Sequence, residues 1–363
     1  MSLGDPLDAA DLRQRVQKAL SAFLATEETV LESLSSSLAP VGSALDEFLL
    51  TGGKRLRPAF AFWGHRAAGG DDSDAVVAAV SSLELLHACA LIHDDVIDGS
   101  DLRRGRPAVH RRFAAAHDDA GYRGRADDFG VASAVVLGDL CHVWADQMFH
   151  SAGLPAEALL AALPVYDTMR VELMAGQYLD VLAQADPSPD VDGALARALR
   201  VARYKSGKYT VERPLHLGAV LAGASLSGPV CAALSDYGLP LGEAFQLRDD
   251  VLGVFGDPDT TGKPAGDDLR DGKRTALVAL ARSRGDAAAR CVLDTYLGRP
   301  DLDAAGVARL RDVMASTGAL AEVERIIAAR TAEALAALDT GALDTEAVAV
   351  LRALAGAATT RHG

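Results

Sequence analysis

Residues 75–98 read AVVAAVSSLELLHACALIHDDVID, an apolar run that ends in three aspartates. Glu84 and His87 interrupt its apolar part, so we interpret the run as a buried core helix and not as a membrane span. On a helix, Asp94 and Asp98 share one face, with their Cβ atoms about 5–6 Å apart. Two carboxylates at this distance repel each other unless a cation lies between them. Mg²⁺ fits, because it takes one or two carboxylates and leaves room for substrate phosphates.

A second acidic motif strengthens this interpretation. For a single acidic triplet, a solvated helix end is the alternative, although acids there oppose the helix dipole. Residues 245–250, FQLRDD, again end an apolar helix in an aspartate pair, and a basic loop follows each motif. If the two motifs face each other across a cavity in a helix bundle, they can hold several Mg²⁺ ions around one diphosphate.

Helical spacing recurs along the rest of the chain. Apolar residues return at three- and four-residue intervals in residues 194–204 and 320–338, and convincing alternating strands are absent from the sequence. Glycine and proline clusters divide the chain into about a dozen helices without an obvious linker. Two longer polar segments, residues 98–130 and 256–274, each begin beside an aspartate pair, which favours functional loops there.

Composition narrows the class of protein. The chain has 363 residues, 36 basic and 50 acidic side chains, and a formal net charge of −14. A nucleic-acid partner is not expected, because binding a polynucleotide needs a basic face. No signal peptide or transmembrane segment is apparent, so we expect a cytoplasmic protein. The cysteines form no CxxC pair and are predicted to be buried free thiols: Cys89, Cys141, Cys231 and Cys291.

Basic residues gather near the acidic motifs. Residues 52–58, GGKRLRP, combine glycines that permit close backbone approach with a proline suited to a first helical turn, a pattern typical of an anion site. Arg103 and Arg104 follow the first motif, Lys205 lies in the run YKSGKY, and His87 lies two helical turns before the first motif. Taken singly, these features have alternatives: a basic cap, solvated arginines and a core histidine.

Together, these motifs resemble those of the polyprenyl synthetase family, the trans-isoprenyl diphosphate synthases, and most of all a geranylgeranyl diphosphate synthase. GGKRLRP, LLHxxxLIHDDVID, RRGRP, GQYLD, YKSGKYT, FQLRDDVLG and DGKRT occur in the family's order and at similar spacing, over roughly residues 15–350. The resemblance implies the all-α isoprenoid synthase fold, with long helices around a central cavity, and a homodimer. It also implies one domain over residues 1–363, with the ends 1–14 and 351–363 peripheral.

The resemblance further implies an activity, the magnesium-dependent condensation of isopentenyl diphosphate with allylic diphosphates. Mg²⁺ ions, three with substrate bound, would be held by Asp94, Asp98 and Asp249, supported by Asp95 and Asp250. The allylic diphosphate would contact Arg103, Lys205, Ser206, Gln246, Lys263 and Lys273. Isopentenyl diphosphate would contact Lys54, Arg57, His87 and Arg104, with Arg55 nearby, and Asp180 would lie near the reacting carbon.

One position departs from the family pattern. Where many members have a second DDxxD motif, residues 249–253 read DDVLG, so no carboxylate follows four residues after Asp249. We expect activity to survive, because Asp249 is the better candidate ligand. Whether Asp257 compensates, and how many Mg²⁺ ions bind, stays open.

Product length is predicted from the residues upstream of the first motif. In this family, the product grows down a tunnel beneath that motif, and bulky side chains block it. Here Ala90 and Cys89 are small, and Leu86 lies a turn further back. We therefore expect geranylgeranyl diphosphate (C20). A farnesyl (C15) or longer product stays open, with Met174 and Tyr178 as candidate plugs.

Two other functions share some of these motifs. A class I terpene cyclase shares the fold and a DDxxD motif, but it needs no second diphosphate site. A non-catalytic helical partner subunit would have little need for both aspartate pairs and both basic groups.

Overall fold

The structure, a computed structural model, describes residues 6–186, 193–257 and 266–359. The described residues confirm the predicted all-α fold, in which the strand pair β1 (Leu102–Arg103) and β2 (Arg106–Pro107) is antiparallel and very short. The helical elements are η1 (Pro6–Asp11), α1 (Leu12–Leu34), η2 (Ser36–Leu38), α2 (Ala39–Leu50), α3 (Leu56–Ala67), α4 (Asp74–Ile97), α5 (Val109–Asp119), α6 (Ala126–His150), α7 (Ala156–Ala185), α8 (Ala194–Val201), η3 (Ala202–Glu212), α9 (Arg213–Leu221), α10 (Pro229–Phe255), α12 (Asp267–Arg270), α13 (Ala276–Arg284), α14 (Ala287–Tyr296), α15 (Ala304–Ser316), α16 (Ala319–Ala337), η4 (Leu338–Thr340) and α17 (Thr345–Thr359).

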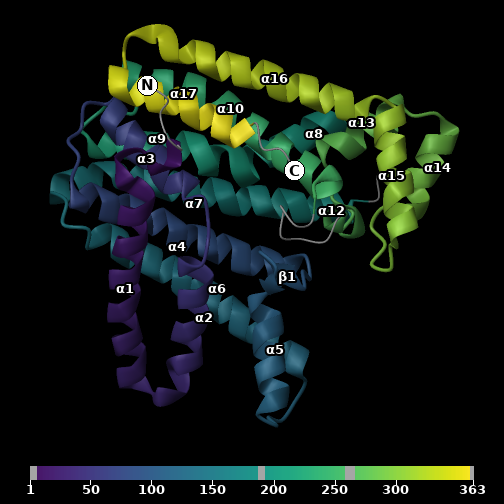
Figure 1. Ribbon diagram of the computed structural model, residues 1–363, viewed down its shortest axis with the longest axis horizontal. Helices are drawn as coiled ribbons and strands as arrows, with labels where there is room; N and C mark the ends of the chain where they lie inside the picture. Colours follow the sequence, from purple (N-terminus) through teal and green to yellow (C-terminus); the bar gives the residue numbers. More distant parts are fainter. Residues whose placement is uncertain (1–5, 187–192, 258–265, 360–363) are drawn as a thin grey trace.

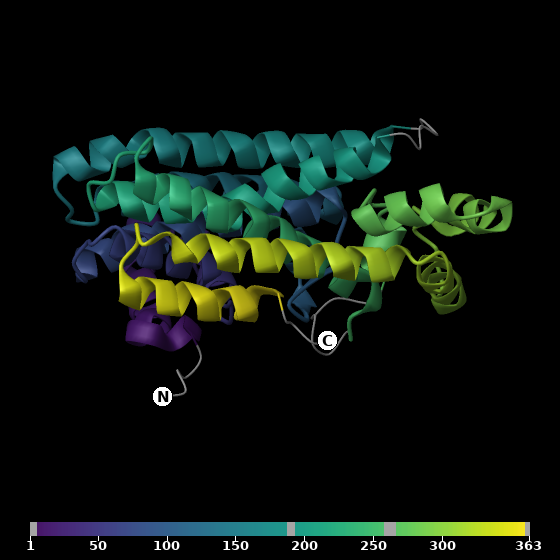
Figure 2. The ribbon, with the colours of Figure 1, turned by 90° about the horizontal axis from the view of Figure 1, so that it is seen from above.

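The long helices set the shape of the molecule. In Figure 1, α4, α7, α10 and α16 follow the long axis, while α1 and α2 form an antiparallel pair that projects to one side. The helices α13, α14 and α15 gather at one end. Figure 2 shows α7 along one long edge of the molecule.

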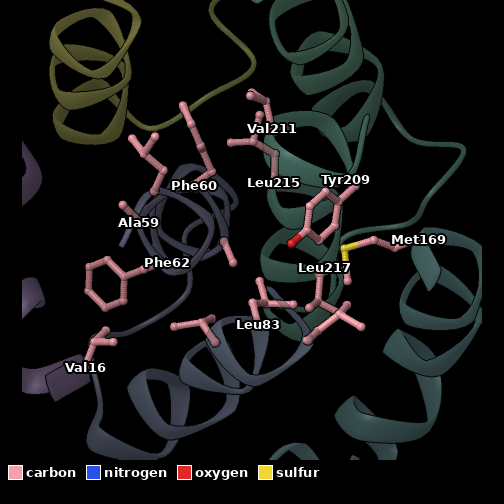
Figure 3. Close-up of a cluster of buried hydrophobic side chains, with 14 of the residues drawn as sticks. Val16, Ala59, Phe60, Phe62, Leu83, Met169, Tyr209, Val211, Leu215 and Leu217 are labelled. Atoms are coloured by element: carbon pink, nitrogen blue, oxygen red, sulfur yellow. The ribbon is translucent and has the colours of Figure 1, made fainter. Parts of the chain in front are cut away.

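Two hydrophobic clusters fill the bundle, and α10 belongs to both. Figure 3 shows part of the larger one, where side chains of α3, α4, α7, η3 and α9 meet around Phe60, Leu83 and Leu215. The smaller one joins α10, through Leu247 and Val251, to α12–α16. Each fully buried leucine or phenylalanine contributes about 1.5–3 kcal/mol. The N-terminal part of α10 is therefore held by the larger cluster, and its C-terminal part, with the second aspartate pair, by the smaller one.

The helix α4 is the buried core helix that the sequence predicts. By length and composition alone, two of the described helices, α4 and α6, are apolar enough to cross a membrane. In α4, 72% of the most apolar window is buried within the bundle, against 39% in α6. The helix α6 packs against α4 and α5 and leaves Val136 and Val143 exposed. The absence of a transmembrane segment stays a prediction.

Two expectations are wrong. Residues 98–130 are not loop throughout, because they contain the strand pair, all of α5 and the start of α6. In α5, Val109 and Phe113 lie one turn apart and are buried, an apolar face that the surrounding charges obscure in the sequence. Cys291 is exposed whereas the other three cysteines are buried, since α14 buries only Leu293 fully.

Candidate active site

A cavity of about 740 Å³ lies between the start of α3, the end of α4, α7, η3 and α10. Most of the residues that the sequence indicates line it: Lys54, Arg55, Arg57, His87, Ala90, Asp94, Arg103, Arg104, Asp180, Lys205, Ser206, Gln246, Asp249, Asp250 and Lys273. Four predicted residues do not line it: Leu86, Cys89, Asp95 and Asp98. Lys263 lies outside the described residues.

Asp94, near the end of α4, is surrounded by cations. Its Oδ1 accepts hydrogen bonds from Gln177 Nε2 at 2.9 Å and from Lys205 Nζ at 3.0 Å. Arg103 Nη2 lies 3.7 Å from the other oxygen. Burial alone would raise the pKa of Asp94, but Lys205, Lys273 and Arg103 hold it well below its usual range. The carboxylate is therefore ionised and suited to a cation.

Asp95 points away from the cavity and fixes Arg103. Its side chain is 1% exposed, and Arg103 Nε lies 3.0 and 3.1 Å from its two oxygens. Because a bidentate guanidinium–carboxylate pair sets the plane of both groups, Asp95 holds Arg103 beside Asp94. This arrangement agrees with a supporting role for Asp95.

Asp98 does not line the cavity, but its buried carboxylate pairs with a lysine and keeps capacity to accept hydrogen bonds or a cation. Its side chain is 1% exposed, and neither oxygen accepts a hydrogen bond of normal geometry within the described residues, although Lys273 Nζ forms an ion pair with Oδ2 at 2.8 Å. Burial raises its pKa, an effect that Lys273 partly offsets. Buried carboxylate oxygens without hydrogen bonds fit a hard divalent cation, which also takes oxygen from a phosphate.

The second motif presents a different environment. Asp249 and Asp250 both line the cavity, and Gln246 Nε2 donates to Asp250 Oδ1 at 2.8 Å. Burial raises the pKa of Asp250 to about 7, with Asp268 and Asp249 adding repulsion. Within the described ranges, no three acidic, histidine or cysteine side chains converge on one point. The motif therefore offers one or two carboxylates from the protein, as Mg²⁺ typically uses beside a substrate phosphate.

The segment η3 that carries Lys205 is a π-helix, a wide turn that is frequent at functional sites. It touches the backbones of both neighbouring helices. A Cβ atom at Gly176 of α7 would lie 2.3 Å from Lys205 N, and one at Gly242 of α10 would lie 2.4 Å from Gly207 O. Only glycine fits such approaches, so these contacts fix the position of the Lys205 backbone.

Lys205 joins three elements at the cavity wall. Its Nζ donates to Asp94 Oδ1 on α4 at 3.0 Å and to Asp180 Oδ2 on α7 at 2.6 Å. Burial would lower the pKa of Lys205, but these two carboxylates raise it. The ammonium is therefore charged, and Asp180 lies beside the first motif.

The space beside Gly253, where the family pattern has an acidic side chain, is occupied by another carboxylate. A Cβ atom at Gly253 would lie 1.9 Å from Asp268 Oδ2, so the carboxylate of Asp268 occupies the space of that side chain. Asp268 Oδ1 lies 3.3 Å from Lys273 Nζ. Asp268 lines the cavity next to Asp250, and the sequence interpretation, which considered Asp257, overlooked it.

The opposite side of the cavity is cationic. Arg57 Nη2 donates to Thr210 Oγ1 at 2.9 Å, and its guanidinium carbon lies 4.2 Å from the centre of the Tyr209 ring. The Tyr209 hydroxyl and His87 Nδ1 are 2.9 Å apart. Burial, then the charges of Arg57 and Arg104, holds the pKa of His87 well below its usual value. His87 is therefore neutral at neutral pH, and Tyr209 orients its ring.

Arg104 and Arg55 differ in their surroundings. The guanidinium carbon of Arg104 lies 5.9 Å from the centre of the Phe48 ring. Arg55 also borders the cavity, but it donates to Glu84, Gln17 and the Leu49 carbonyl. Arg55 is thus committed to protein acceptors.

The predicted chain-length residues lie at different depths. Ala90 lines the cavity, whereas Leu86 and Cys89 are buried in the larger hydrophobic cluster, and Cys89 Sγ lies 3.8 Å from His93 Nδ1. The candidate plugs Met174 and Tyr178 are 42% and 68% exposed, so both point to the surface of the chain.

Comparison with known proteins gives a consistent result. Residues 40–314 match the family model described as Polyprenyl synthetase. A geranylfarnesyl diphosphate synthase of Aeropyrum pernix is 32% identical over 295 residues, which is 80% of this chain and 84% of that protein. A geranylgeranyl diphosphate synthase of Mycobacterium tuberculosis is 33% identical over 288 residues, or 79% of this chain and 75% of that protein.

A solved structure is similar over nearly the whole chain. The geranylgeranyl pyrophosphate synthase of Corynebacterium glutamicum, complexed with isoprenyl diphosphate and magnesium, superimposes with a TM-score of 0.91 and 41% identity, covering 97% of this chain and 99% of that one. The matched region includes both aspartate motifs and the cationic side of the cavity. The chain therefore belongs to the polyprenyl synthetase family and is a prenyltransferase that makes trans-prenyl diphosphates.

Proposed function

We propose that this enzyme condenses isopentenyl diphosphate with allylic diphosphates and stops at geranylgeranyl diphosphate (C20). The observation that carries this proposal is one cavity with two charged sides, Asp94, Lys205 and Lys273 on one and Arg57 and Arg104 on the other. Two diphosphates need two such sides, whereas a terpene cyclase needs one. The same observation argues against a non-catalytic partner subunit.

The acidic side would hold the allylic diphosphate through Mg²⁺. Asp94 and Asp98 supply carboxylate oxygens from one helix, and Asp249 supplies another from α10. Magnesium, when bound, neutralises the diphosphate and makes it a better leaving group. We propose three ions per site, supported by the separate positions of Asp98 and Asp249. The lysines of this side, Lys205 and Lys273, would contact the phosphate oxygens.

The cationic side would hold isopentenyl diphosphate through Lys54, Arg57, His87 and Arg104. A neutral His87 still donates one hydrogen bond. If the Tyr209 hydroxyl donates to Nδ1, the ring proton lies on Nε2, the nitrogen left for a phosphate. Arg57 Nε is buried without a hydrogen-bond partner within the described residues, which leaves donor capacity for an anion.

These residues account for each step of the condensation. The allylic C–O bond breaks heterolytically, and Lys205, Lys273 and Arg103 stabilise the departing pyrophosphate. The double bond of isopentenyl diphosphate, held close by its own cations, attacks the allylic cation and forms the new C–C bond. A proton then leaves to the pyrophosphate, so no side-chain base is required. Leu173 and Phe245 in the wall limit the access of water to the cation.

Product length follows from the wall beside Ala90. Ala90 lines the cavity with a small side chain, and the turn of α4 before Asp94 carries no phenylalanine, tyrosine or tryptophan. This favours a chain longer than C15. The relatives named above carry the names of products of different length, so a C15 or a longer product is the alternative.

We also propose a homodimer, which would cover an exposed apolar face on α6 and α7. Along these two helices the exposed large apolar side chains are Phe129, Val131, Val135, Val136, Val143, Leu160, Val171, Met174, Tyr178, Val181 and Leu182. So many exposed apolar side chains on two neighbouring segments of the chain favour a protein–protein contact. Light scattering showing a monomer at micromolar concentration would contradict this proposal.

We further propose that residues 1–363 act as one domain, since α10 is shared by both hydrophobic clusters.

Product analysis tests the proposed function. The purified protein would be incubated with Mg²⁺, isopentenyl diphosphate and, separately, dimethylallyl, geranyl or farnesyl diphosphate. The dephosphorylated products would then be sized by mass spectrometry. A dominant C20 alcohol is expected. A C15 or C25 alcohol would support the condensation reaction but contradict the proposed product length. If folded protein elongates no primer, the cyclase or the non-catalytic subunit would be favoured.

A further inference from the structure

The cationic side of the cavity depends on a short turn. Lys54 lies in the connection between α2 and α3, and Arg57 lies in the first turn of α3. Gly52, Gly53 and Arg55 all have positive φ, of 85°, 98° and 53°. This conformation is uncommon for a residue with a Cβ atom, and it persists where surrounding contacts enforce it. The conformation at Arg55 therefore needs an anchor.

The Arg55 side chain supplies that anchor. Its Nη1 donates to Glu84 Oε2 at 2.6 Å, and its Nη2 donates to Gln17 Oε1 at 2.8 Å and to the Leu49 carbonyl. The side chains of Arg55 and Glu84 are 5% and 4% exposed. Three helices, α1, α2 and α4, thus hold one guanidinium in the core. A buried ion pair with further hydrogen bonds has far less freedom than a surface pair.

The anchored guanidinium lies directly against the turn. A Cβ atom at Gly53 would lie 3.3 Å from Arg55 Nη1 and 3.6 Å from Arg104 Nη2. The guanidinium groups of Arg55 and Arg104 therefore both pack against Gly53, the residue before Lys54. Glu84 is three residues before His87 on α4, so the carboxylate lies on the face that also carries His87.

We propose that Glu84 is a positioning residue for isopentenyl diphosphate. It holds Arg55 in the core, and Arg55 in turn fixes the left-handed turn that presents Lys54 and Arg57 to the cavity. Arg55 then acts as an anchor and not as a phosphate ligand, which revises the expectation from the sequence. This inference rests on the proposed function, because it assigns the cationic side to isopentenyl diphosphate.

Three variants test the role of the pair. Glu84→Gln keeps the shape of the side chain and removes its charge, and Arg55→Met removes the guanidinium. The double variant Arg55→Met with Glu84→Leu replaces the ion pair by apolar groups, an exchange that commonly preserves folding. For each variant, kcat and both KM values would be measured, together with the melting temperature and the Kd of isopentenyl diphosphate by calorimetry with Mg²⁺.

All three variants are expected to raise the KM and the Kd of isopentenyl diphosphate at least about tenfold, while kcat at saturation and the KM of the allylic substrate change less than about threefold. The double variant should be no worse than Arg55→Met, because Glu84 acts through its contact with Arg55. Glu243→Gln is the matched control: Glu243 is 3% exposed and accepts from Arg203 Nε at 2.6 Å, but it does not line the cavity. Its KM values should stay near those of the wild type.

The outcomes separate this inference from the proposed function. A Kd of isopentenyl diphosphate unchanged in Glu84→Gln and in the double variant would overturn the positioning role. Equal increases in both KM values, or the same increases in Glu243→Gln, would show a general loss of packing and would also overturn it. If the wild-type protein binds isopentenyl diphosphate but elongates no primer, the proposed function is contradicted. The positioning role of Glu84 is then still tested, because it is measured by the Kd of isopentenyl diphosphate in each variant.

Discussion

Gly253→Asp would recreate the DDxxD motif that the sequence lacks, and we expect it to reduce activity. If the position merely lacked an acid, the substitution would be neutral or beneficial. In the structure, however, a Cβ atom at position 253 lies 1.9 Å from Asp268 Oδ2, whereas real Cβ contacts are essentially never under 3.0 Å. Asp268 must therefore move by about 1 Å or more before the new side chain fits.

The expected loss of activity follows from the contacts between Asp268 and Lys273. Its Oδ1 lies 3.3 Å from Lys273 Nζ, and its backbone oxygen accepts from Lys273 N at 3.0 Å. Displacing the carboxylate weakens one contact to a buried charged group, worth about 1.5–3 kcal/mol. Because about 1.4 kcal/mol corresponds to a factor of ten in rate, kcat/KM for the allylic substrate should fall about tenfold to a hundredfold.

Steady-state kinetics of four variants would test this. Gly253→Ala isolates the steric effect and should lose activity without added charge. Asp268→Ala removes the contact with Lys273. Combining Gly253→Asp with Asp268→Ala exchanges one carboxylate for the other and should recover part of the activity of Gly253→Asp. The reasoning is refuted if Gly253→Asp matches the wild type in kcat/KM, since the space at this position would then be free.

Three further predictions concern the metal site, the tunnel and the dimer. Burial raises the pKa of Asp250 from 3.8 to about 7, so ionisation of this carboxyl group destabilises the folded state. Without metal, the free energy of unfolding of the wild type should therefore fall by about 2–4 kcal/mol relative to that of Asp250→Asn between pH 4 and pH 7. The same pH dependence in both proteins, measured by denaturation in EDTA, would contradict this. Ala90→Phe should shorten the main product by at least one five-carbon unit in mass spectrometry, and an unchanged product would remove Ala90 from the tunnel wall. Val136→Asp, at a side chain 62% exposed on α6, should halve the mass found by light scattering without changing helicity, whereas an unchanged dimer would place the interface elsewhere.

Local patterns in the sequence predicted the helices and most of the cavity wall. The apolar run before Asp94 is the buried α4, and Asp94, the second aspartate pair and most of the GGKRLRP segment line one cavity. These features depend on residues close together in the chain, at helical spacing. The predicted product-length residues Leu86 and Cys89 lie in the larger hydrophobic cluster and not in the cavity wall. Helical spacing indicates which residues share a face of α4, but it does not indicate which partner helix covers that face.

Features that depend on distant residues could not be predicted. The π-helical conformation around Lys205 depends on backbone contacts with Gly176 and Gly242, which are 29 and 37 positions away in the chain. The inward direction of Arg55 depends on Glu84, 29 positions away. Asp268 replaces a side chain at position 253 only because α12 folds back against α10. Each of these is a tertiary contact with no local signal in the sequence.

The pairing of charges in the cavity accounts for how, under the proposed function, an acidic chain would hold two anions. Asp94 pairs with Lys205 and Asp98 with Lys273, so the acidic side is largely neutralised before any ligand binds. With Mg²⁺ and diphosphate bound, the aspartates would be available to hold the metal and the lysines to contact the phosphate. Asp94 and Asp98 would then have a partner of opposite charge with and without the ligand, which avoids leaving a buried charge unpaired. Among the described residues that line the cationic side, the acidic side chain is Glu84, whose partner Arg55 is turned into the core. Under the proposed function this side would bind a diphosphate without metal, and Mg²⁺ should strengthen the binding of allylic diphosphate much more than that of isopentenyl diphosphate.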